Sequence, residues 1–374
     1  MVEKIVNSNF NEKKDSNSKL KHIVKLNFST IVEKITVYYN NLELPYLSRL
    51  NESHYKVKYA YGTSGFRMNS EYLDIVALRL GFMLSVRSTL LSLPIGLMIT
   101  ASHNKNSDNG FKIADLNGRT LCKEWENLCE EIVNSKNFIS DASNFLRKYL
   151  FSNTEEVPFY SKVVLGWDTR TSSPHLIEVV KTSLIHFNTQ IIEYGLVTSP
   201  QLHFMTFLSQ KQILEGKRFK EISKLNKSYL KPQEESNSEV IYPKEIYFDI
   251  YRDGSLKTFL ELYDKLKEKE QKINYESHLV IDYGNGVGGT QENKDGIASL
   301  LKVIDKNFNI GFTNDLTTDP ELLNEKSGTE HVQKNFTLPN EFYETLELRK
   351  FEIQENKQIK ACSLDGDADR IVYL

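Results

Sequence analysis

The sequence predicts an α/β fold with more than one domain, and three observations favour this class. Helical periodicity alternates along the chain with short, β-rich apolar runs, the pattern of sheets covered by helices. Two of these apolar runs end directly in polar, turn-forming clusters, as strands do where an α/β fold presents functional groups. The 374 residues, 40% of them hydrophobic, can build the cores of two or three domains.

The first half of the chain alternates helix and strand signals. Apolar residues recur on one helical face over 71–93, and the apolar run 96–100 predicts a strand directly after it. The run 162–168 predicts a second strand, which a turn connects to an amphipathic helix over 175–187 and a strand over 189–195.

The second half begins with an irregular stretch. Residues 209–245 are rich in Lys, Glu, Ser and Asn and show no clear apolar periodicity, which predicts a solvated insertion. A second α/β unit follows. Its predicted elements are a helix over 255–271, a strand over 278–284, a glycine turn over 285–289, a helix over 297–308 and a strand over 359–364.

Composition excludes some classes of partner. With 47 basic and 50 acidic residues the formal net charge is −3, so no global field attracts nucleic acid or an anionic membrane. The N-terminal stretch is polar and charged rather than a signal peptide, and the longest apolar run is short and broken by proline. Three cysteines without a CxxC pair favour a reducing compartment. These features predict a cytoplasmic protein.

The first polar cluster is TASHNKNSDNG, residues 100–110, directly after the apolar run GLMI at 96–99. Serine, asparagine, aspartate and glycine favour turns, so composition alone predicts an ordinary surface loop. A functional interpretation of this loop needs a chemical partner elsewhere in the chain.

The second polar cluster supplies that partner, because Asp365, Asp367 and Asp369 follow an apolar strand with small residues between them. Three carboxylates this close repel one another unless a cation lies among them, and a hard divalent ion suits oxygen ligands. The alternative is a charged surface hairpin. An EF-hand is excluded because Arg370 occupies the sixth position of the loop, where that motif needs glycine.

Both clusters resemble motifs of the alpha-D-phosphohexomutase superfamily, whose enzymes move a phosphate between two positions of one sugar. TASHNKNSDNGFK is similar to its phosphoserine loop, and SLDGDADR to its magnesium loop. The resemblance covers roughly residues 55–374. Five further stretches agree with it: YGTSGFR (61–67), GWDTRTSSPHL (166–176), LVTSPQLHF (196–204), VIDYGNGVGG (280–289) and LNEKSGTEHVQ (323–333).

The order of the motifs indicates one branch of the superfamily. In most members the G-x-D-x-R strand precedes the serine loop, whereas here ASHN precedes GWDTR. This order is similar to the branch that acts on N-acetylglucosamine phosphates. The resemblance implies an enzyme that interconverts N-acetylglucosamine 6-phosphate and 1-phosphate through a phosphoserine and a 1,6-bisphosphate, in UDP-N-acetylglucosamine biosynthesis. A glucose or mannose phosphate mutase is the alternative within the superfamily.

The resemblance also implies roles for individual residues. Ser102 would carry the phosphoryl group, and Mg²⁺ would be held by Ser102 together with the aspartates at 365, 367 and 369. Lys112 and His103 are the candidates for handling the sugar hydroxyl proton, with Lys112 preferred because His103 cannot easily hydrogen-bond its neighbour Ser102. Arg67 and Arg370 would bind phosphate oxygens, although without the resemblance each reads as a surface ion pair.

The implied fold is two consecutive three-layer α/β domains with mixed sheets, from a fold that normally has four domains. We expect a phosphoserine-bearing domain over 1–205 and a magnesium-binding domain over 206–374, monomeric, with the insertion near 209–245. The chain stops at Leu374, four residues after the magnesium loop, so we expect the N-terminal part of a longer enzyme. SGTE at 327–330 resembles a phosphate loop of the family but is assigned to the second domain's structure. A non-catalytic protein that binds metal and phosphosugar is the alternative outside the enzyme class.

Overall fold

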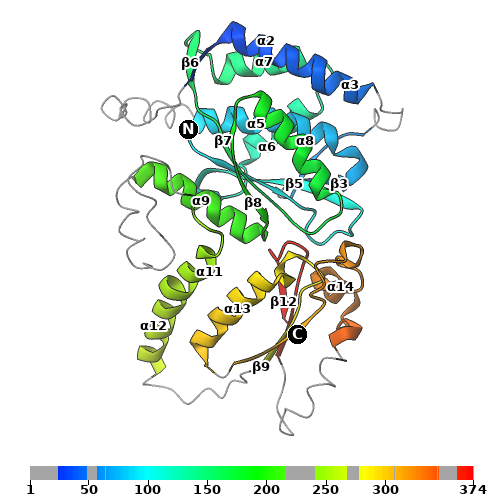
Figure 1. Cartoon of the computed structure of the whole chain (residues 1–374), viewed down its shortest axis with the longest axis vertical. Coiled ribbons are helices and arrows are strands. Elements are labelled where there is room, and N and C mark those ends of the chain that lie inside the picture. Colours follow the sequence, from blue (N-terminus) through cyan, green and yellow to red (C-terminus); the bar gives the residue numbers. More distant parts are fainter. Residues whose placement is uncertain are drawn as a thin grey trace.

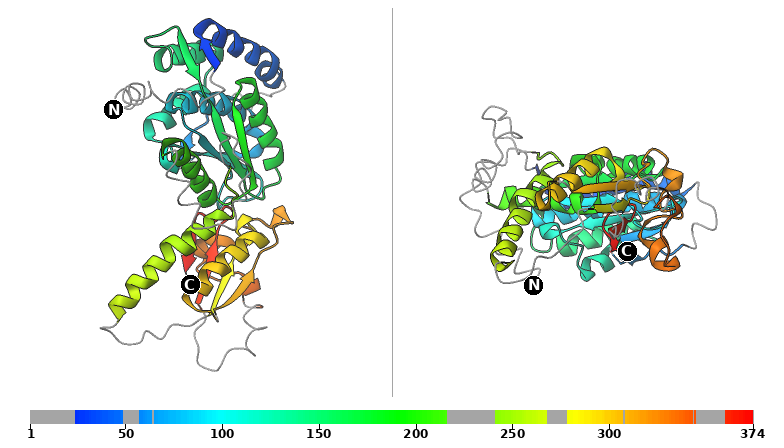
Figure 2. Two further views of the ribbon diagram at one scale, coloured as in Figure 1. Left: turned by 60° about the vertical axis from the view of Figure 1, so that its left-hand side comes forward. Right: turned by 90° about the horizontal axis from the view of Figure 1, so that it is seen from below.

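The described residues fold around two main β-sheets, one in each half of the chain, with a smaller two-stranded sheet in the first half. The computed structural model describes residues 24–48, 57–63, 65–215, 241–267, 278–306, 308–342, 344 and 360–373. Figure 1 shows the half built from the earlier residues above and the later half below, with the C-terminal strand in the lower half. Seen from the side in Figure 2, each half has its own layers of helix and sheet. We call them the first and second unit.

A mixed six-stranded sheet forms the centre of the first unit, in the order β2-β3-β5-β4-β7-β8. Strands β4, β7 and β8 run parallel, whereas β5 is antiparallel to both β4 and β3. The strands are β2 (Tyr61–Gly62), β3 (Gly65–Asn69), β4 (Ile95–Ile99), β5 (Asp108–Ala114), β7 (Lys162–Trp167) and β8 (Gln190–Leu196). The predicted strands at 96–100, 162–168 and 189–195 are thereby confirmed as β4, β7 and β8.

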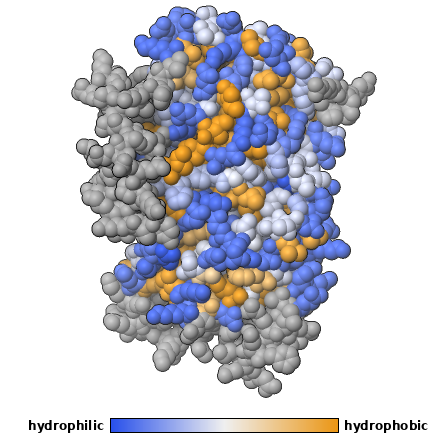
Figure 3. Space-filling model, viewed as in Figure 1, coloured by the Kyte–Doolittle hydropathy of each residue, from blue (hydrophilic) through white to orange (hydrophobic). Residues whose placement is uncertain are grey.

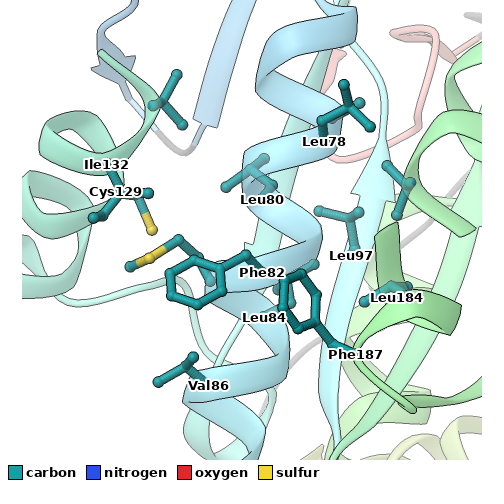
Figure 4. Close-up of a cluster of buried hydrophobic side chains, with 14 of the residues drawn as sticks. Leu78, Leu80, Phe82, Leu84, Val86, Leu97, Cys129, Ile132, Leu184 and Phe187 are labelled. Atoms are coloured by element: carbon teal, nitrogen blue, oxygen red, sulfur yellow. The ribbon is translucent and has the colours of Figure 1, made fainter. Parts of the chain in front are cut away.

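Helices cover both faces of this sheet. On one face lie α5 (Asp74–Leu91) and α8 (Ser173–His186), with α6 (Lys123–Val133) packed on the outer side of α5. Figure 4 shows α5 side chains pointing both toward Cys129 of α6 and toward Leu97 of β4. The helix predicted over 71–93 is confirmed as α5, although its buried residues are not limited to the one apolar face that the sequence shows. Every residue of α5 from 75 to 89 is buried, because α6 covers the side that the sheet leaves open.

Further elements extend the same core beyond the sheet. They are β1 (Val24–Asn27), α2 (Phe28–Tyr38), α3 (Leu44–Leu47), α7 (Phe138–Tyr149) and β6 (Glu156–Phe159), which pairs antiparallel with β1. A buried ion pair between Arg79 of α5 and Glu43 fixes this layer to the rest of the unit, with an Nη2 to Oε1 distance of 2.5 Å. A buried pair of this kind holds position more than it adds stability.

The other face of the sheet is covered by α9 (Ser199–Glu215). Gln210 of this helix is 1% exposed and donates to the backbone carbonyls of Pro94 and Asp115. The prediction of a solvated insertion is therefore wrong at its start, because 209–215 continue helix α9 and the polar side chains of Ser209 and Gln210 are buried against polar partners. The predicted domain boundary at 205/206 falls inside α9, and residues 216–240 of the predicted insertion lie outside the described residues.

A four-stranded sheet in the order β10-β9-β11-β12 organises the second unit. Strand β9 is parallel to β10 and β11, and β12 is antiparallel to β11. The elements are α11 (Ile246–Ile250), α12 (Lys257–Lys267), β9 (His278–Asp282), α13 (Gln291–Ile304), β10 (Asn309–Thr313), α14 (Gly328–Asn335), β11 (Lys360–Leu364) and β12 (Ile371–Tyr373). The helix and strand predictions for this half are confirmed, with bounds shifted by several residues.

The exposed surface is mixed in character. Figure 3 shows hydrophobic residues in several separate patches between hydrophilic ones on the face it presents. Within the described ranges, no helix has both the length and the apolar character needed to cross a membrane.

Candidate active site

Ser102 lies just beyond the end of β4, in the segment 100–107 that we call the serine loop. The parallel strands β4 and β7 end side by side, so their following segments meet at one edge of the sheet. Ser102 adopts a left-handed backbone with φ 56° and is 2% exposed. Its N–H donates to Thr100 Oγ1 at 2.9 Å, and Thr100 Oγ1 in turn donates to Asp168 Oδ2 at 2.6 Å. Local hydrogen bonds thus fix an unusual backbone conformation at the serine.

Arg170 binds the backbone of the serine loop, a role that the sequence analysis missed. Its side chain is fully buried and uses all five N–H groups. The Nε group donates to Asp168 Oδ2 at 3.0 Å. The Nη groups donate to four backbone carbonyl oxygens, those of Ser102 at 3.0 Å, Asn104 at 2.8 Å, Lys105 at 2.5 Å and Asp108 at 2.8 Å. One guanidinium therefore sets the shape of the whole loop.

The aspartates lie in the turn between β11 and β12, residues 365–370, which we call the aspartate loop. Three carboxylate oxygens, one from each aspartate, lie within 4.8 Å of one another. Two glycines let the loop pack closely, because a Cβ on Gly366 would lie 2.8 Å from Ser102 O and one on Gly286 would lie 2.5 Å from Gly366 Cα. Ala368 completes the turn with φ 55°. The small residues between the acids thus allow the two loops to touch.

The serine loop and the aspartate loop meet directly. Ser102 Oγ donates to Asp365 Oδ2 at 2.6 Å and to Asp369 Oδ1 at 3.3 Å. Arg370 donates from Nε to Asp365 Oδ2 at 3.0 Å and from Nη2 to Ser102 Oγ at 3.3 Å. Ser102 therefore lies between two carboxylates and a guanidinium.

Lys112 of β5 reaches the same carboxylates from the first unit. Its Nζ contacts Asp367 Oδ2 at 2.5 Å and Asp369 Oδ2 at 2.6 Å, and the lysine side chain is 4% exposed. Burial opposes the charged form, but the two carboxylates raise the pKa of Lys112 above its ordinary value. In this arrangement Lys112 is a firmly protonated counter-ion.

The pKa values of Asp365 and Asp367 are shifted in opposite directions. Burial together with the neighbouring carboxylates raises the pKa of Asp365 to about 7. Asp367 is also buried, which works against its ionised form, but Lys112 and the hydroxyl of Ser199 hold its pKa below the ordinary value. Ser199, at the start of α9, donates to Asp367 Oδ2 at 2.5 Å and was not predicted from the sequence.

The arrangement fits a magnesium ion. Asp367 Oδ1 is buried and has no hydrogen-bond partner among the described residues, although a buried carboxylate oxygen normally has one. This free oxygen, the adjacent carboxylates and Ser102 Oγ form an all-oxygen donor set, which is the set that Mg²⁺ prefers. Arg370 of the same turn and Lys112 of β5 offset part of the negative charge.

A cavity of about 710 Å³ opens onto Ser102. It is lined by Ser102, Lys112, Asp369 and Arg370 together with residues of the β2–β3 hairpin. Arg67 lies on the hairpin side, where its Nη2 donates to Thr63 O at 2.6 Å. The volume is in the range of small-molecule sites, and cationic groups lie on more than one wall.

His103 also lines the cavity, beside Ser102. Its Nε2 lies 4.0 Å from Glu330 Oε2, and its buried Nδ1 has no hydrogen-bond partner in the part of the chain that is described. Burial and the nearby Arg370 lower the pKa of His103. The neutral form of the His103 ring is therefore favoured, whereas Lys112 is held in its charged form.

The structure thus brings the predicted site residues together at one place. Ser102, His103, Lys112, Arg67, Arg370 and Asp369 line the cavity, and Asp365 and Asp367 lie beneath Ser102. Their catalytic and binding roles stay predictions. Arg170 and Ser199 were missed, although each belongs to a stretch, GWDTR or TSP, that the sequence analysis had already connected with the site.

Comparisons with known proteins find similar sugar-phosphate mutases. Residues 82–140 match the family described as phosphoglucomutase/phosphomannomutase, alpha/beta/alpha domain I. The phosphoacetylglucosamine mutase of Saccharomyces cerevisiae is 31% identical over 334 residues, which are 85% of this chain and 51% of the relative. This chain spans about half the length of the curated relatives it matches.

Solved structures give the same result. The N-acetylphosphoglucosamine mutase of Aspergillus fumigatus, in complex with GlcNAc-6P and magnesium, aligns with a TM-score of 0.63 and 25% identity, covering 93% of this chain and 53% of that one. The substrate complex of an N-acetylglucosamine-phosphate mutase, a member of the alpha-D-phosphohexomutase superfamily, aligns with a TM-score of 0.62 and 28% identity, covering 91% and 54%.

A serine loop that meets an aspartate loop between two α/β units defines the class, and the chain belongs to the alpha-D-phosphohexomutase superfamily. Its relatives and structural neighbours narrow this further. Within the superfamily, the relatives and solved structures that match most of this chain are phosphoacetylglucosamine mutases, the branch that the motif order predicts.

Proposed function

We propose that Ser102 carries the transferable phosphoryl group of a mutase that interconverts N-acetylglucosamine 6-phosphate and 1-phosphate. The observation that carries the proposal is the position of Ser102 Oγ, at the cavity and 2.6 Å from Asp365 Oδ2. Phosphoryl transfer depends mainly on positioning and on neutralising charge, and the side chains around Ser102 offer both. The names of the relatives support the sugar. We propose UDP-N-acetylglucosamine biosynthesis as the pathway.

Mg²⁺ would be held by Ser102 and the three aspartates, where it would supply charge neutralisation for the transferring phosphoryl group. The free oxygen of Asp367 supports this assignment. A phosphoserine carries a charge of about −1.5 to −2 near neutral pH, so the ion and the phosphate would nearly cancel each other. Arg370, 3.3 Å from Ser102 Oγ, would bind a phosphate oxygen, and Arg67 would bind the substrate's phosphate across the cavity.

The proton of the attacking sugar hydroxyl needs an acceptor within hydrogen-bond reach. His103 and Lys112 both line the cavity. Lys112 is engaged by two carboxylates that keep it protonated, which leaves His103 as the candidate acceptor in this state. The monomeric state and the cytoplasmic location stay predictions from the sequence.

The test is phosphorylation of the 374-residue chain by a sugar bisphosphate in the presence of Mg²⁺, followed by intact-mass and peptide analysis. We expect one phosphate, on Ser102, and none on the Ser102→Ala variant. Ser107→Ala is the matched control, because Ser107 is an exposed serine of the same loop and should leave labelling unchanged. Reproducible labelling of another residue, with Ser102→Ala still labelled, would remove Ser102 from the reaction.

The choice of sugar tests the alternatives. Faster labelling by the N-acetylglucosamine bisphosphate than by the glucose or mannose bisphosphates is expected. The reverse order would favour a glucose or mannose phosphate mutase. A chain that binds Mg²⁺ but is never phosphorylated would support the non-catalytic alternative.

A further inference from the structure

A side chain of the second unit hydrogen-bonds to the backbone of the serine loop. Asn324, in the segment between β10 and α14, donates from Nδ2 to Ser102 O at 2.9 Å and to Asn104 O at 3.0 Å. The same two carbonyl oxygens accept hydrogen bonds from Arg170 of the first unit. The serine loop is therefore held from both units at the same two backbone positions.

The residues around Asn324 in the second unit fix the orientation of its side-chain amide. Asn324 has φ 56°, a left-handed conformation that asparagine tolerates, and its N–H donates to Gly284 O at 2.8 Å. Its Oδ1 lies against Gly284 and Gly328, where an added Cβ would come within 3.2 Å and 2.8 Å of that oxygen. The motifs around these glycines, DYGNG and SGTE, thereby leave room for the amide and fix which way its NH₂ group points.

The two hydrogen bonds from Asn324 also set the distance between the reacting serine and the aspartates. A Cβ on Gly366 would lie 2.8 Å from Ser102 O and 3.1 Å from Asn324 Nδ2, so carbonyl, amide and aspartate loop form one compact contact. Ser102 Oγ is only three bonds from the carbonyl carbon that Asn324 helps to hold. A shift of the Ser102 backbone would change the 2.6 Å contact between Ser102 Oγ and Asp365 Oδ2 directly.

We propose that Asn324 is a positioning residue for phosphoryl transfer, which holds the Ser102 backbone in register with the aspartate loop when the two units are together. The role rests on the proposed function of Ser102. Asn324 touches backbone carbonyls of the serine loop and acts on the reaction only through them. A positioning residue should affect the maximal rate more than the affinity for the phosphoryl donor.

The test compares Asn324→Ala and Asn324→Asp with the unchanged chain. Each net hydrogen bond is worth about 1 kcal/mol, or roughly a factor of five, so losing two should slow maximal phosphorylation of Ser102 by about tenfold or more. The half-saturating bisphosphate concentration should stay within twofold. Asn324→Asp keeps the size of the side chain but cannot donate, so it should be as slow as Asn324→Ala.

Lys244→Ala is the control, because it removes a different contact between the units, the 3.0 Å hydrogen bond from Lys244 Nζ to Leu196 O, together with the 2.8 Å pair with Glu292, and neither partner belongs to the serine loop or the aspartate loop. It should phosphorylate at the unchanged rate. Three results would overturn the positioning role. The maximal rate of Asn324→Ala could fall by less than fivefold, or Asn324→Asp could be as fast as the unchanged chain. The substitution could also change only the half-saturating bisphosphate concentration.

A second measurement does not depend on phosphorylation. The amides of Asn104 and Asp108 bond within the serine loop, to Ala101 O and Lys105 O, and should exchange hydrogen at least fivefold faster in Asn324→Ala but not in Lys244→Ala. An unchanged exchange rate of these amides would contradict the claim that Asn324 holds the serine loop. If the unchanged chain is never phosphorylated, the proposed function fails, while the exchange experiment still decides whether Asn324 holds the loop.

Discussion

Replacing Arg170 by methionine should destabilise the first unit strongly. The substitution keeps an unbranched side chain but removes five hydrogen bonds and the partner of Asp168, whose side chain is also fully buried. Removing one member of a buried ion pair typically costs about 3–5 kcal/mol, because the other charge is left without its partner. With roughly 2–4 °C per kcal/mol for a domain of this size, Tm should fall by about 6–20 °C.

The assay is thermal unfolding of three variants beside the unchanged chain. Arg170→Met combined with Asp168→Asn removes the stranded charge and should recover at least about 1 kcal/mol relative to Arg170→Met alone. Arg170→Lys keeps the charge but cannot reach four carbonyls at once, so it should lie between the unchanged chain and Arg170→Met. A cost below about 1 kcal/mol for Arg170→Met, or a double variant no more stable than the single, would refute the reasoning.

The same variant makes a prediction about pH. Burial raises the pKa of Asp168 and Arg170 opposes this shift, so removing Arg170 should raise the pKa further. A carboxyl whose folded pKa lies above its unfolded pKa loses stability as pH rises through the folded value. The difference in Tm between Arg170→Met and the unchanged chain should therefore be larger at pH 8 than at pH 5, and a smaller difference at pH 8 would contradict the assignment to Asp168.

Two further predictions concern the aspartate loop and the core. Mg²⁺ should raise the Tm of the unchanged chain and of Asp295→Asn, an exposed carboxylate on α13, but not that of Asp367→Asn; a preserved response in Asp367→Asn would exclude Asp367 as a ligand. Gly81→Ala should cost about 1–3 kcal/mol in chemical denaturation, because the new Cβ would overlap Ser183 of α8, whereas Gly254→Ala, with open space around it, should change little; equal effects would refute the packing argument.

The sequence predicted the strands and helices because their apolar residues form runs or periodic patterns that are visible locally. The run 96–99 is apolar and is buried on both faces as part of β4, as a central strand should be. The meeting of Ser102 with the aspartates was also predictable, because both motifs follow apolar strands and a resemblance connected them. Local pattern and motif were sufficient wherever the deciding contacts lie close in sequence or belong to a known motif.

Long-range polar burial was not predictable in this way. The sequence predicts solvated side chains at Ser209 and Gln210, yet Gln210 is buried against the carbonyls of Pro94 and Asp115. These partners lie about a hundred residues earlier, so no local pattern indicates them. Arg170 and Asn324 are similar, since each binds backbone carbonyls that carry no sequence signature of their own. A backbone carbonyl is the same chemical group at every residue, so no pattern of residue types indicates which one a side chain will bind.

The two units depend on each other through charge at the active site. The second unit by itself holds three carboxylates within 4.8 Å, and such a cluster is strongly self-repelling in a buried setting. Arg370 offsets one charge from within the same loop, whereas Lys112, which contacts Asp367 and Asp369, comes from β5 of the first unit. Because Lys112 is 4% exposed, salt screens these contacts little. The attraction that completes the site therefore also holds the units together, so a substitution at Lys112 should weaken both at once.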